Sequence, residues 1–226
     1  MKAFLIAAFF LPFSLSVIAQ SDTAALLAQA ESKLRSSSAT VSSILTDKTY
    51  ISVHPHIPFR KLIKKYSSDK ALTITTDDEP GKKIKVLCTV KNEAGQTIAD
   101  ALVYLYQTDS RGWYAADAPH VQMYEGDMRH ARLFGYVKTN KQGQFELHTV
   151  KPSGYPQSDL PAHIHVHVTA NGYQSYINEF LFDDDERLVG NIRANAQRND
   201  FIISKPEKAT DPFQQQFSYT ITLAKY

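Results

Sequence analysis

Three histidines stand at alternate positions of one short apolar segment, and this spacing suits metal binding. His163, His165 and His167 are separated by Ile164 and Val166. In a regular β-strand, alternate side chains point to the same face, so two of these imidazoles can reach one ion. An ordinary polar sheet face would show the same alternation, so the histidines alone leave both interpretations open.

Two tyrosines lie in local sequences that also suggest a site. Tyr155 stands in residues 149–156 (TVKPSGYP), and Tyr114 closes residues 109–114 (DSRGWY). Because a free phenol has a pKa of about 10, a tyrosine becomes a phenolate ligand only beside a strongly charged hard cation. Ferric iron is such a cation, whereas structural zinc sites favour thiolate and imidazole. Taken singly, either tyrosine could equally be an amphipathic residue at the rim of a sheet.

Together these segments resemble the signatures of the intradiol ring-cleavage dioxygenases, the family of catechol and protocatechuate dioxygenases. Residues 160–166 (LPAHIHV) are similar to the family's Pro-Ala-His-Ile-His-Phe run, and residues 149–156 to its Thr-hydrophobic-Lys/Arg-Pro-Gly-x-Tyr-Pro segment. Residues 135–143 are similar to the Gly-x-hydrophobic-x-Thr-Asp-x-x-Gly segment between the two tyrosines. The likeness covers residues 81–185 and implies one Fe(III) held by four ligands: Tyr114, Tyr155, His163 and His165.

The resemblance implies that the chain cleaves a catechol-type ring with O2 and releases a muconate-type diacid. The ortho-diphenol would lose its protons as it chelates the iron, and Tyr155 would leave the metal and take up a proton. The iron would serve as Lewis acid and template. His167 lies outside the family pattern, and we interpret it as a residue beside the site or at the surface rather than a fifth ligand.

Two positions depart from the family pattern and concern catalysis more than metal binding. Leu160 stands where the family places an arginine before the histidines, so a fixed positive charge for the anionic substrate is missing. Glu179 stands where a glutamine is expected, and its carboxylate could repel an anionic intermediate or act as a base. Glu179 is therefore a candidate catalytic residue beside Tyr155. Three cations on the loops could replace the missing charge: Arg129, Arg132 and Lys151.

Two alternatives come from other functional classes. Leu160 and Glu179 fit a non-catalytic β-sandwich module that binds a metal or an aromatic molecule. A transthyretin-like carrier or adhesion domain without a metal would also explain a pattern of many short strands.

The elements expected to position these residues are short strands joined by turns. Residues 83–90 carry apolar side chains at every second position, and residues 92–95 then predict a hairpin turn. A similar turn at residues 140–143 joins expected strands at residues 136–139 and 144–148. Further strands are expected at residues 101–106, 162–169, 175–182, 201–204 and 217–223. This pattern predicts an all-β fold, an antiparallel β-sandwich with long metal-binding loops and a short N-terminal helical extension.

The first 19 residues have the pattern of an export signal. Lys2 precedes a largely apolar run over residues 3–18, which is short for a membrane span, and Ala19 suits cleavage by signal peptidase. We therefore expect a periplasmic or secreted protein without stable membrane association after cleavage. An uncleaved N-terminal anchor is the alternative.

Residues 20–66 form the expected extension, and residues 67–226 the dioxygenase-like β-sandwich domain. Leucines and alanines at helical spacing predict a helix over residues 22–34. Beyond it, prolines favour extended or irregular backbone, with His54 and His56 interpreted as surface residues.

The composition excludes several classes of function. The formal net charge of +2 falls to +1 without Lys2, and no sustained basic stripe supports nucleic-acid binding. Cys88 is the single cysteine, so we expect a buried strand residue and no intrachain disulfide. Dinucleotide-binding glycine motifs and a nucleophile elbow are absent from the sequence. The expected partners are a small diphenol and O2, and a homodimer is left open.

Overall fold

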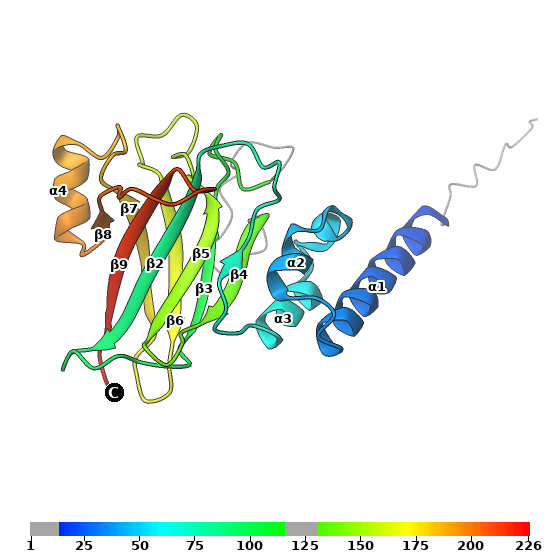
Figure 1. Cartoon of the computed structure of the whole chain (residues 1–226). Helices are drawn as coiled ribbons and strands as arrows, with labels where there is room; N and C mark the ends of the chain where they lie inside the picture. The colour runs from blue at the N-terminus through cyan, green and yellow to red at the C-terminus, as the bar shows by residue number, and fades with distance from the viewer. Residues whose placement is uncertain (1–13, 116–130) are drawn as a thin grey trace, which may run out of the picture.

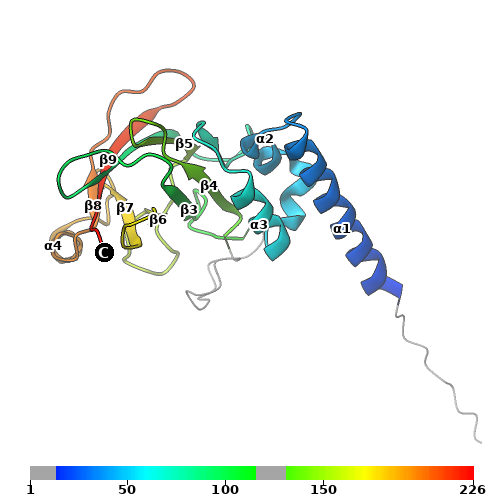
Figure 2. The same cartoon turned by 90° about the horizontal axis from the view of Figure 1, so that it is seen from below.

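Two β-sheets lie face to face as two layers in the computed structural model, which describes residues 14–115 and 131–226, with backbone only for residues 14–21 (Figures 1 and 2). The strands of the described residues are β1 (Leu72–Thr73), β2 (Lys83–Asn92), β3 (Leu102–Gln107), β4 (Leu133–Lys138), β5 (Gln144–Val150), β6 (His163–Thr169), β7 (Tyr176–Phe182), β8 (Ile202–Ser204) and β9 (Gln215–Leu223). One sheet has the order β1-β5-β2-β9 and the other the order β4-β3-β6-β7-β8. Two stacked sheets agree with the expected β-sandwich.

The alternating sequence pattern explains how the layers pack. Along β2, buried and half-buried residues alternate without interruption, and Cys88 is buried as a free thiol, as expected. Along β6, the side chains of Ile164, Val166 and Val168 are almost fully buried in the common core. Because alternate side chains of a strand point to opposite faces, His163 and His165 lie on the other face of their sheet.

The prediction that the sheets are antiparallel was wrong for three strand pairs. β1 pairs with β5, β2 with β9, and β7 with β8 in the parallel direction. The remaining strand pairs are antiparallel. A period of two in hydrophobicity is the same for both directions, so the sequence pattern could not distinguish them.

The second of the two predicted hairpin turns joins different sheets. Gly143 N donates to Asn140 O at 2.9 Å, but β4 before this turn and β5 after it belong to opposite layers. At the first turn, Gly95 N donates to Asn92 O at 2.9 Å, and a single bridge follows before the chain passes to the other sheet. The sequence identified both turns, because the turn residues act locally, but not the strands that they connect.

Helices lie beside the β4 edge of the sandwich (Figures 1 and 2): α1 (Ser14–Arg35), α2 (Val41–Thr46), the 3-10 helix η1 (Lys48–Val53) and α3 (Ile57–Lys65). α1 confirms the helix predicted over residues 22–34. The irregular backbone predicted after it was wrong. Thr40 and Ser43 cap α2 reciprocally, and Pro58 falls in the first turn of α3, where proline is compatible with a helix.

The helices are joined to the sandwich by a buried contact with β4. Phe59 of α3 meets Phe134 at a ring-centroid distance of 6.4 Å, and the Arg60 guanidinium lies 3.7 Å from the centre of the Phe134 ring. His54 stacks on Phe59 at 5.1 Å and is buried, so its assignment to the surface was wrong. His56 is exposed, as expected.

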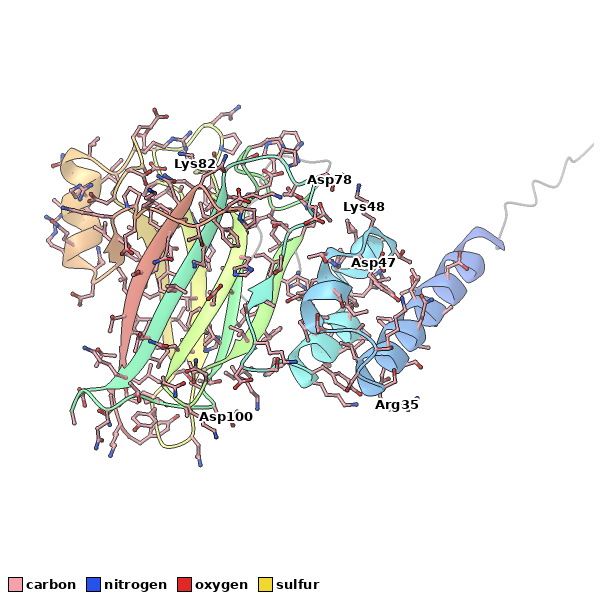
Figure 3. The ribbon with its side chains drawn as sticks, viewed as in Figure 1. Arg35, Asp47, Lys48, Asp78, Lys82 and Asp100 are labelled. Atoms are coloured by element: carbon pink, nitrogen blue, oxygen red, sulfur yellow. The ribbon has the colours of Figure 1, made fainter. Side chains whose placement is uncertain are left out.

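A second contact between the helices and the sandwich lies at the surface. Lys48 of η1 and Asp78, which follows β1, point toward each other (Figure 3), and their charged atoms are 2.5 Å apart. Both side chains are more than half exposed, and exposed ion pairs of this kind contribute little to stability. The apolar contacts of α3 therefore hold the helices in place.

The chain between β7 and β8 forms α4 (Gly190–Arg198), on the far side of the sandwich from α1 (Figure 1). This helix was not predicted from the sequence. Throughout residues 14–115 and 131–226, no helix combines the length and the apolar character that a membrane span requires.

Candidate metal centre

The four predicted ligand residues meet at one end of the sandwich. Tyr114 follows β3, Tyr155 follows β5, and both histidines lie at the start of β6. The Tyr114 hydroxyl oxygen is 2.7 Å from that of Tyr155 and 2.8 Å from His165 Nε2, and the Tyr155 hydroxyl oxygen is 3.0 Å from His163 Nε2. The convergence expected from the sequence is therefore observed. The role of these atoms as metal ligands stays a prediction.

The orientation of His163 is determined by a backbone carbonyl. Its Nδ1 lies 2.8 Å from Pro161 O, and a carbonyl oxygen only accepts, so Nδ1 carries the proton and donates. The Nε2 atom then has its lone pair free to face Tyr155. This is the tautomer that a metal ligand requires.

His165 is held between side chains of the two neighbouring strands. In the sheet register it stands opposite Tyr106 of β3 and Glu179 of β7. The Tyr106 ring stacks on the imidazole at 4.2 Å with an interplanar angle of 10°, and Glu179 Oε1 is 3.4 Å from Nδ1. Glu179 therefore lies on the far side of the imidazole from Tyr114, which is near Nε2.

Two glycines allow the tyrosine-bearing loops to pack together. A Cβ added to Gly112, whose φ is +82°, would lie 2.3 Å from Gly154 O. A Cβ added to Gly154 would lie 2.1 Å from Leu160 O. Side chains at these positions would push the loops apart, so Gly112, two residues before Tyr114, and Gly154, next to Tyr155, each permit a close backbone contact.

Asp109 organises the turn that leads to Tyr114. Its Oδ1 accepts from the backbone N–H of Arg111 at 2.8 Å and of Trp113 at 3.1 Å. Its Oδ2 lies 2.6 Å from the Arg111 guanidinium. Because this carboxylate is buried, its hydrogen bonds hold the turn firmly.

The cations suggested as replacements for the missing charge are engaged elsewhere. Arg132 makes two contacts of 2.7 Å with Glu79, and its backbone N–H donates to Tyr114 O. Lys151 pairs with Asp184 at 2.6 Å. Arg129 lies outside the described residues.

A cation is needed if Tyr114 is to ionise. Burial raises the pKa of the Tyr114 phenol well above its ordinary value, and the neighbouring Tyr155 raises it further. Neighbouring donor atoms 2.7–3.0 Å apart have the spacing of adjacent ligands around one ion with metal-ligand bonds of about 2 Å. Two phenol oxygens and two imidazole nitrogens at this spacing fit a hard trivalent cation.

Glu179 belongs to a second group of potential ligands. Within the part of the chain that the structure describes, His163, His165 and Glu179 offer ligand atoms that all lie within 4.8 Å of one another. His167 is not a member of this group. The pKa of His167 is lowered, chiefly by burial and further by the charge of Lys64. Lys64 belongs to α3, one of the helices beside the sandwich.

Arg187 also contacts the site and was not predicted from the sequence. This residue follows β7, and its Nη1 donates to Tyr155 O at 3.0 Å and to Leu160 O at 3.3 Å. No motif in the sequence singles it out, because backbone carbonyls of any residue type can accept such bonds.

A separate hollow of about 340 Å³ lies on the outer face of the other sheet, lined in part by Asp69, Leu87, Asn140 and Glu146. It contains none of the four converging residues, and its position on β2 and β5 places it on the opposite layer.

Comparisons with known proteins agree on one family. The model of the family Dioxygenase_C, described as dioxygenase, matches residues 59–225. A chlorocatechol 1,2-dioxygenase of Rhodococcus opacus is 27% identical over 128 residues, which cover 49% of this chain and 48% of that protein. An intradiol ring-cleavage dioxygenase of Aspergillus niger is 26% identical over 190 residues, which cover 75% of this chain and 55% of that protein.

A solved structure extends the likeness to the fold. The dioxygenase domain of a dioxygenase and carbohydrate-binding fusion protein from a Streptomyces species has a TM-score of 0.52 and 20% identity. The match covers 71% of this chain and 90% of that chain. In contrast, the chain spans about half the length of the curated relatives that it matches.

Proposed function

The chain belongs to the intradiol ring-cleavage dioxygenase family, and on this premise we propose that it cleaves a catechol-type ring with O2, using one ferric ion, to a muconate-type diacid. The observation that carries the proposal is the meeting of two phenol oxygens and two imidazole Nε2 atoms, each within 3.0 Å of the next. Tyr114, Tyr155, His163 and His165 would hold the ion. When bound, ferric iron supplies a Lewis acid and a template for the diphenol oxygens.

The two tyrosines have different roles in this proposal. Tyr114 is buried, with 4% of its surface exposed, and it contacts both Tyr155 and His165. Tyr155 is half-buried and is carried by an irregular loop. Tyr155 is therefore the ligand that can move away from the site and accept a proton from an incoming diphenol, while Tyr114 stays in place.

Glu179 is proposed to act through His165. A carboxylate that accepts the Nδ1 proton of a histidine makes the opposite nitrogen a stronger donor to a metal, and Glu179 Oε1 lies 3.4 Å from Nδ1. The earlier interpretation of Glu179 as a base acting on the substrate requires a direct path to the substrate. Its place behind the imidazole ring favours the indirect role.

A second candidate function is binding of the ion without turnover. Leu160 in place of an arginine favours it, because a charge that would stabilise an anionic substrate is absent at that position. Loss of one preorganised charge contact raises a catalytic barrier by about 3–4 kcal/mol.

Oxygen uptake by iron-loaded protein distinguishes the two candidates. The purified chain should take up iron, turn red-brown from charge transfer between tyrosinate and iron, and consume O2 with at least one member of a catechol panel. Tyr114→Phe and His163→Ala should lose the colour. Tyr226→Phe, which changes a tyrosine that is 89% exposed, should keep it.

Two outcomes would decide against the proposal. Red-brown protein that consumes no O2 with any catechol would support binding without turnover. Colourless protein that retains no iron would exclude both candidates and leave the metal-free carrier or adhesion domain.

We further propose that residues 1–19 are removed during export to the periplasm or the medium. Lys2 and the apolar run that ends before Ala19 support this proposal. Mass spectrometry of protein recovered from outside the cytoplasm should find a chain that begins at Gln20, and an intact Met1 in that fraction would contradict cleavage.

A further inference from the structure

The loop that carries Tyr155 needs support from outside itself. Residues 151–162 contain no helix or strand. Within the loop, Ser158 N donates to Tyr155 O at 3.3 Å, a long bond. Gln157 has a φ of +61°, which is unfavourable for a residue with a side chain. The loop therefore holds a strained turn with weak internal bonding.

Arg187, in the connection that follows β7, bonds to both ends of this turn. A single nitrogen, Nη1, donates to the carbonyl oxygens of Tyr155 and Leu160, at the two ends of the turn. A Cβ added to Gly154 would lie 2.5 Å from the same nitrogen. The guanidinium thus occupies space that exists because residue 154 is glycine.

The segment that delivers Arg187 is itself well held. Asp185 accepts from Arg187 N at 2.9 Å through Oδ1 and from Ala162 N at 3.2 Å through Oδ2. Leu188, the next residue, is fully buried in a cluster with Leu181. The connection after β7 therefore holds the loop before β6 through hydrogen bonds of both Arg187 and Asp185.

The guanidinium bonds to the loop backbone rather than to a carboxylate. Within residues 14–115 and 131–226, no ion pair joins Arg187 to a carboxylate, although Arg111, Arg132 and Arg193 have such pairs. Its hydrogen bonds to Tyr155 and Leu160 go to neutral carbonyls, so its contacts with the loop hold the backbone.

We propose that Arg187 is a positioning residue for Tyr155. By holding the backbone of Tyr155 at its carbonyl, it keeps the phenol oxygen within reach of Tyr114 and His163. This inference rests on the proposed function, because it concerns how firmly the same site holds its iron.

Arg187→Met tests the proposal by removing the hydrogen-bond donor. The variant should bind iron about 10- to 100-fold more weakly than the wild type, the range typical of residues that orient metal ligands. It should therefore lose its iron to a chelator faster. Its charge-transfer band should weaken or shift, because Tyr155 no longer holds its place. Arg187→Lys, which retains a charged nitrogen donor, should restore part of both properties.

Arg198→Met is the matched control. Arg198 is exposed on α4, and its guanidinium bonds to Asn195 rather than to the loop. This variant should keep the wild-type rate of iron loss and the wild-type spectrum. A merely structural role for Arg187 would lower the melting temperature of its variants while leaving the spectrum unchanged.

The outcomes separate this inference from the proposed function. Coloured wild-type protein together with an Arg187→Met variant of unchanged spectrum and iron loss would overturn the inference alone. Colourless wild-type protein would instead overturn the proposed function. Should Arg187→Met fail to fold, Arg187→Gln takes its place. The glutamine side chain is too short to reach both carbonyls, so a wild-type rate of iron loss in that variant would equally overturn the inference.

Discussion

The candidate ligands differ in how closely their neighbours restrict them. His163 is held by one backbone carbonyl at 2.8 Å, and His165 by a stacked ring on one side and a carboxylate at Nδ1. A histidine whose Nδ1 proton is accepted by a carboxylate is the better metal donor at Nε2. The two histidines should therefore respond differently when their partners are changed.

Glu179→Gln should weaken iron binding while leaving the fold unchanged. The amide retains an acceptor oxygen but not the negative charge, so His165 Nε2 becomes a weaker donor. We expect roughly a 10-fold loss of affinity, at the lower end of the effect of such partners, measured by competition with a chelator. Glu186→Gln, a change of the same kind at an exposed position, should have no effect. Equal affinities for the Glu179 variant and the wild type would show that the carboxylate does not act through His165.

Single residues were predictable from the sequence where a local motif surrounds them. Tyr155 and His163 each stand in a short run that resembles a family signature, so their roles could be inferred without a fold. Arg187 could not be found in this way, because it bonds to main-chain carbonyls far away in the sequence. The pairing of Arg132 with Glu79 was equally hidden, since both partners are ordinary charged residues on loops.

At the level of loops and turns, glycine contacts determine whether the site can form. Gly154→Ala should abolish or strongly reduce iron retention, because the new methyl group would lie 2.1 Å from Leu160 O and the loop must move. Overpacking of this kind destabilises a protein by about 1–3 kcal/mol. Far-ultraviolet circular dichroism should remain that of a folded β-protein while the visible absorption is lost.

Gly95→Ala is the control for this glycine prediction. An added Cβ there would meet nothing within 4 Å, but φ is +79°, so strain without a clash is expected. This variant should lose about 1–2 kcal/mol of stability and keep its iron. Iron loss in both variants would show that Gly154→Ala acts by general destabilisation rather than through the loop contact.

The contact between the helices and β4 should make stability depend on pH. Burial lowers the pKa of His54 to about 4, and the nearby arginines Arg60 and Arg132 also lower it, while its hydrogen bond to Arg132 O opposes the shift. In the unfolded chain the pKa returns to about 6.5. The neutral ring thus contributes stability that is fully present above pH 6.5 and is lost as the pH falls through 4.

The expected loss of unfolding free energy from His54 is on the order of 3 kcal/mol between pH 7 and pH 4. Urea unfolding of the wild type and of His54→Asn at both values measures it. The asparagine can donate to Arg132 O but does not titrate, so its pH dependence should be smaller by that amount. His56→Asn, changed at an exposed position, should show the same change in unfolding free energy with pH as the wild type. If the unfolding free energies of the wild type and His54→Asn changed equally with pH, His54 would not be the source of the pH dependence.

Helices and strands were predictable where their periodic pattern continued over enough residues to be detected. The alternation in β2, β6 and β9 identified strands because half of each strand is buried. The short helices α2 and α3 escaped, since a few residues show no clear period and tertiary contacts such as Phe59 against Phe134 stabilise them. The direction of the strands and the sheets to which the strands on either side of a turn belong depend on the path of the whole chain. A local sequence pattern does not determine them.

One hydrophobic cluster joins the helices to both sheets. It includes Ala30 of α1, Tyr50 of η1, Phe59 of α3, Val86 of β2 and Val166 of β6, all almost fully buried. The hydrophobic period changes after residue 66, and this change predicted a boundary between residues 20–66 and the domain that follows. The match to the dioxygenase family begins at residue 59, inside α3. The change in period therefore marks a change of secondary structure within a shared core.

A shared core predicts that the helices and the sheets unfold together. Urea unfolding followed by far-ultraviolet circular dichroism reports the helices and strands, whereas fluorescence of Trp113, the single tryptophan, reports the turn beside Tyr114. Because the Phe59 contact links α3 to β4, and Arg132 beside β4 bonds to Tyr114 O, both signals should change at the same urea concentration. Phe59→Ala should move both midpoints down together, by the equivalent of about 3–5 kcal/mol. If the helical signal were lost at lower urea while Trp113 fluorescence stayed native, residues 20–66 would be an independently unfolding unit.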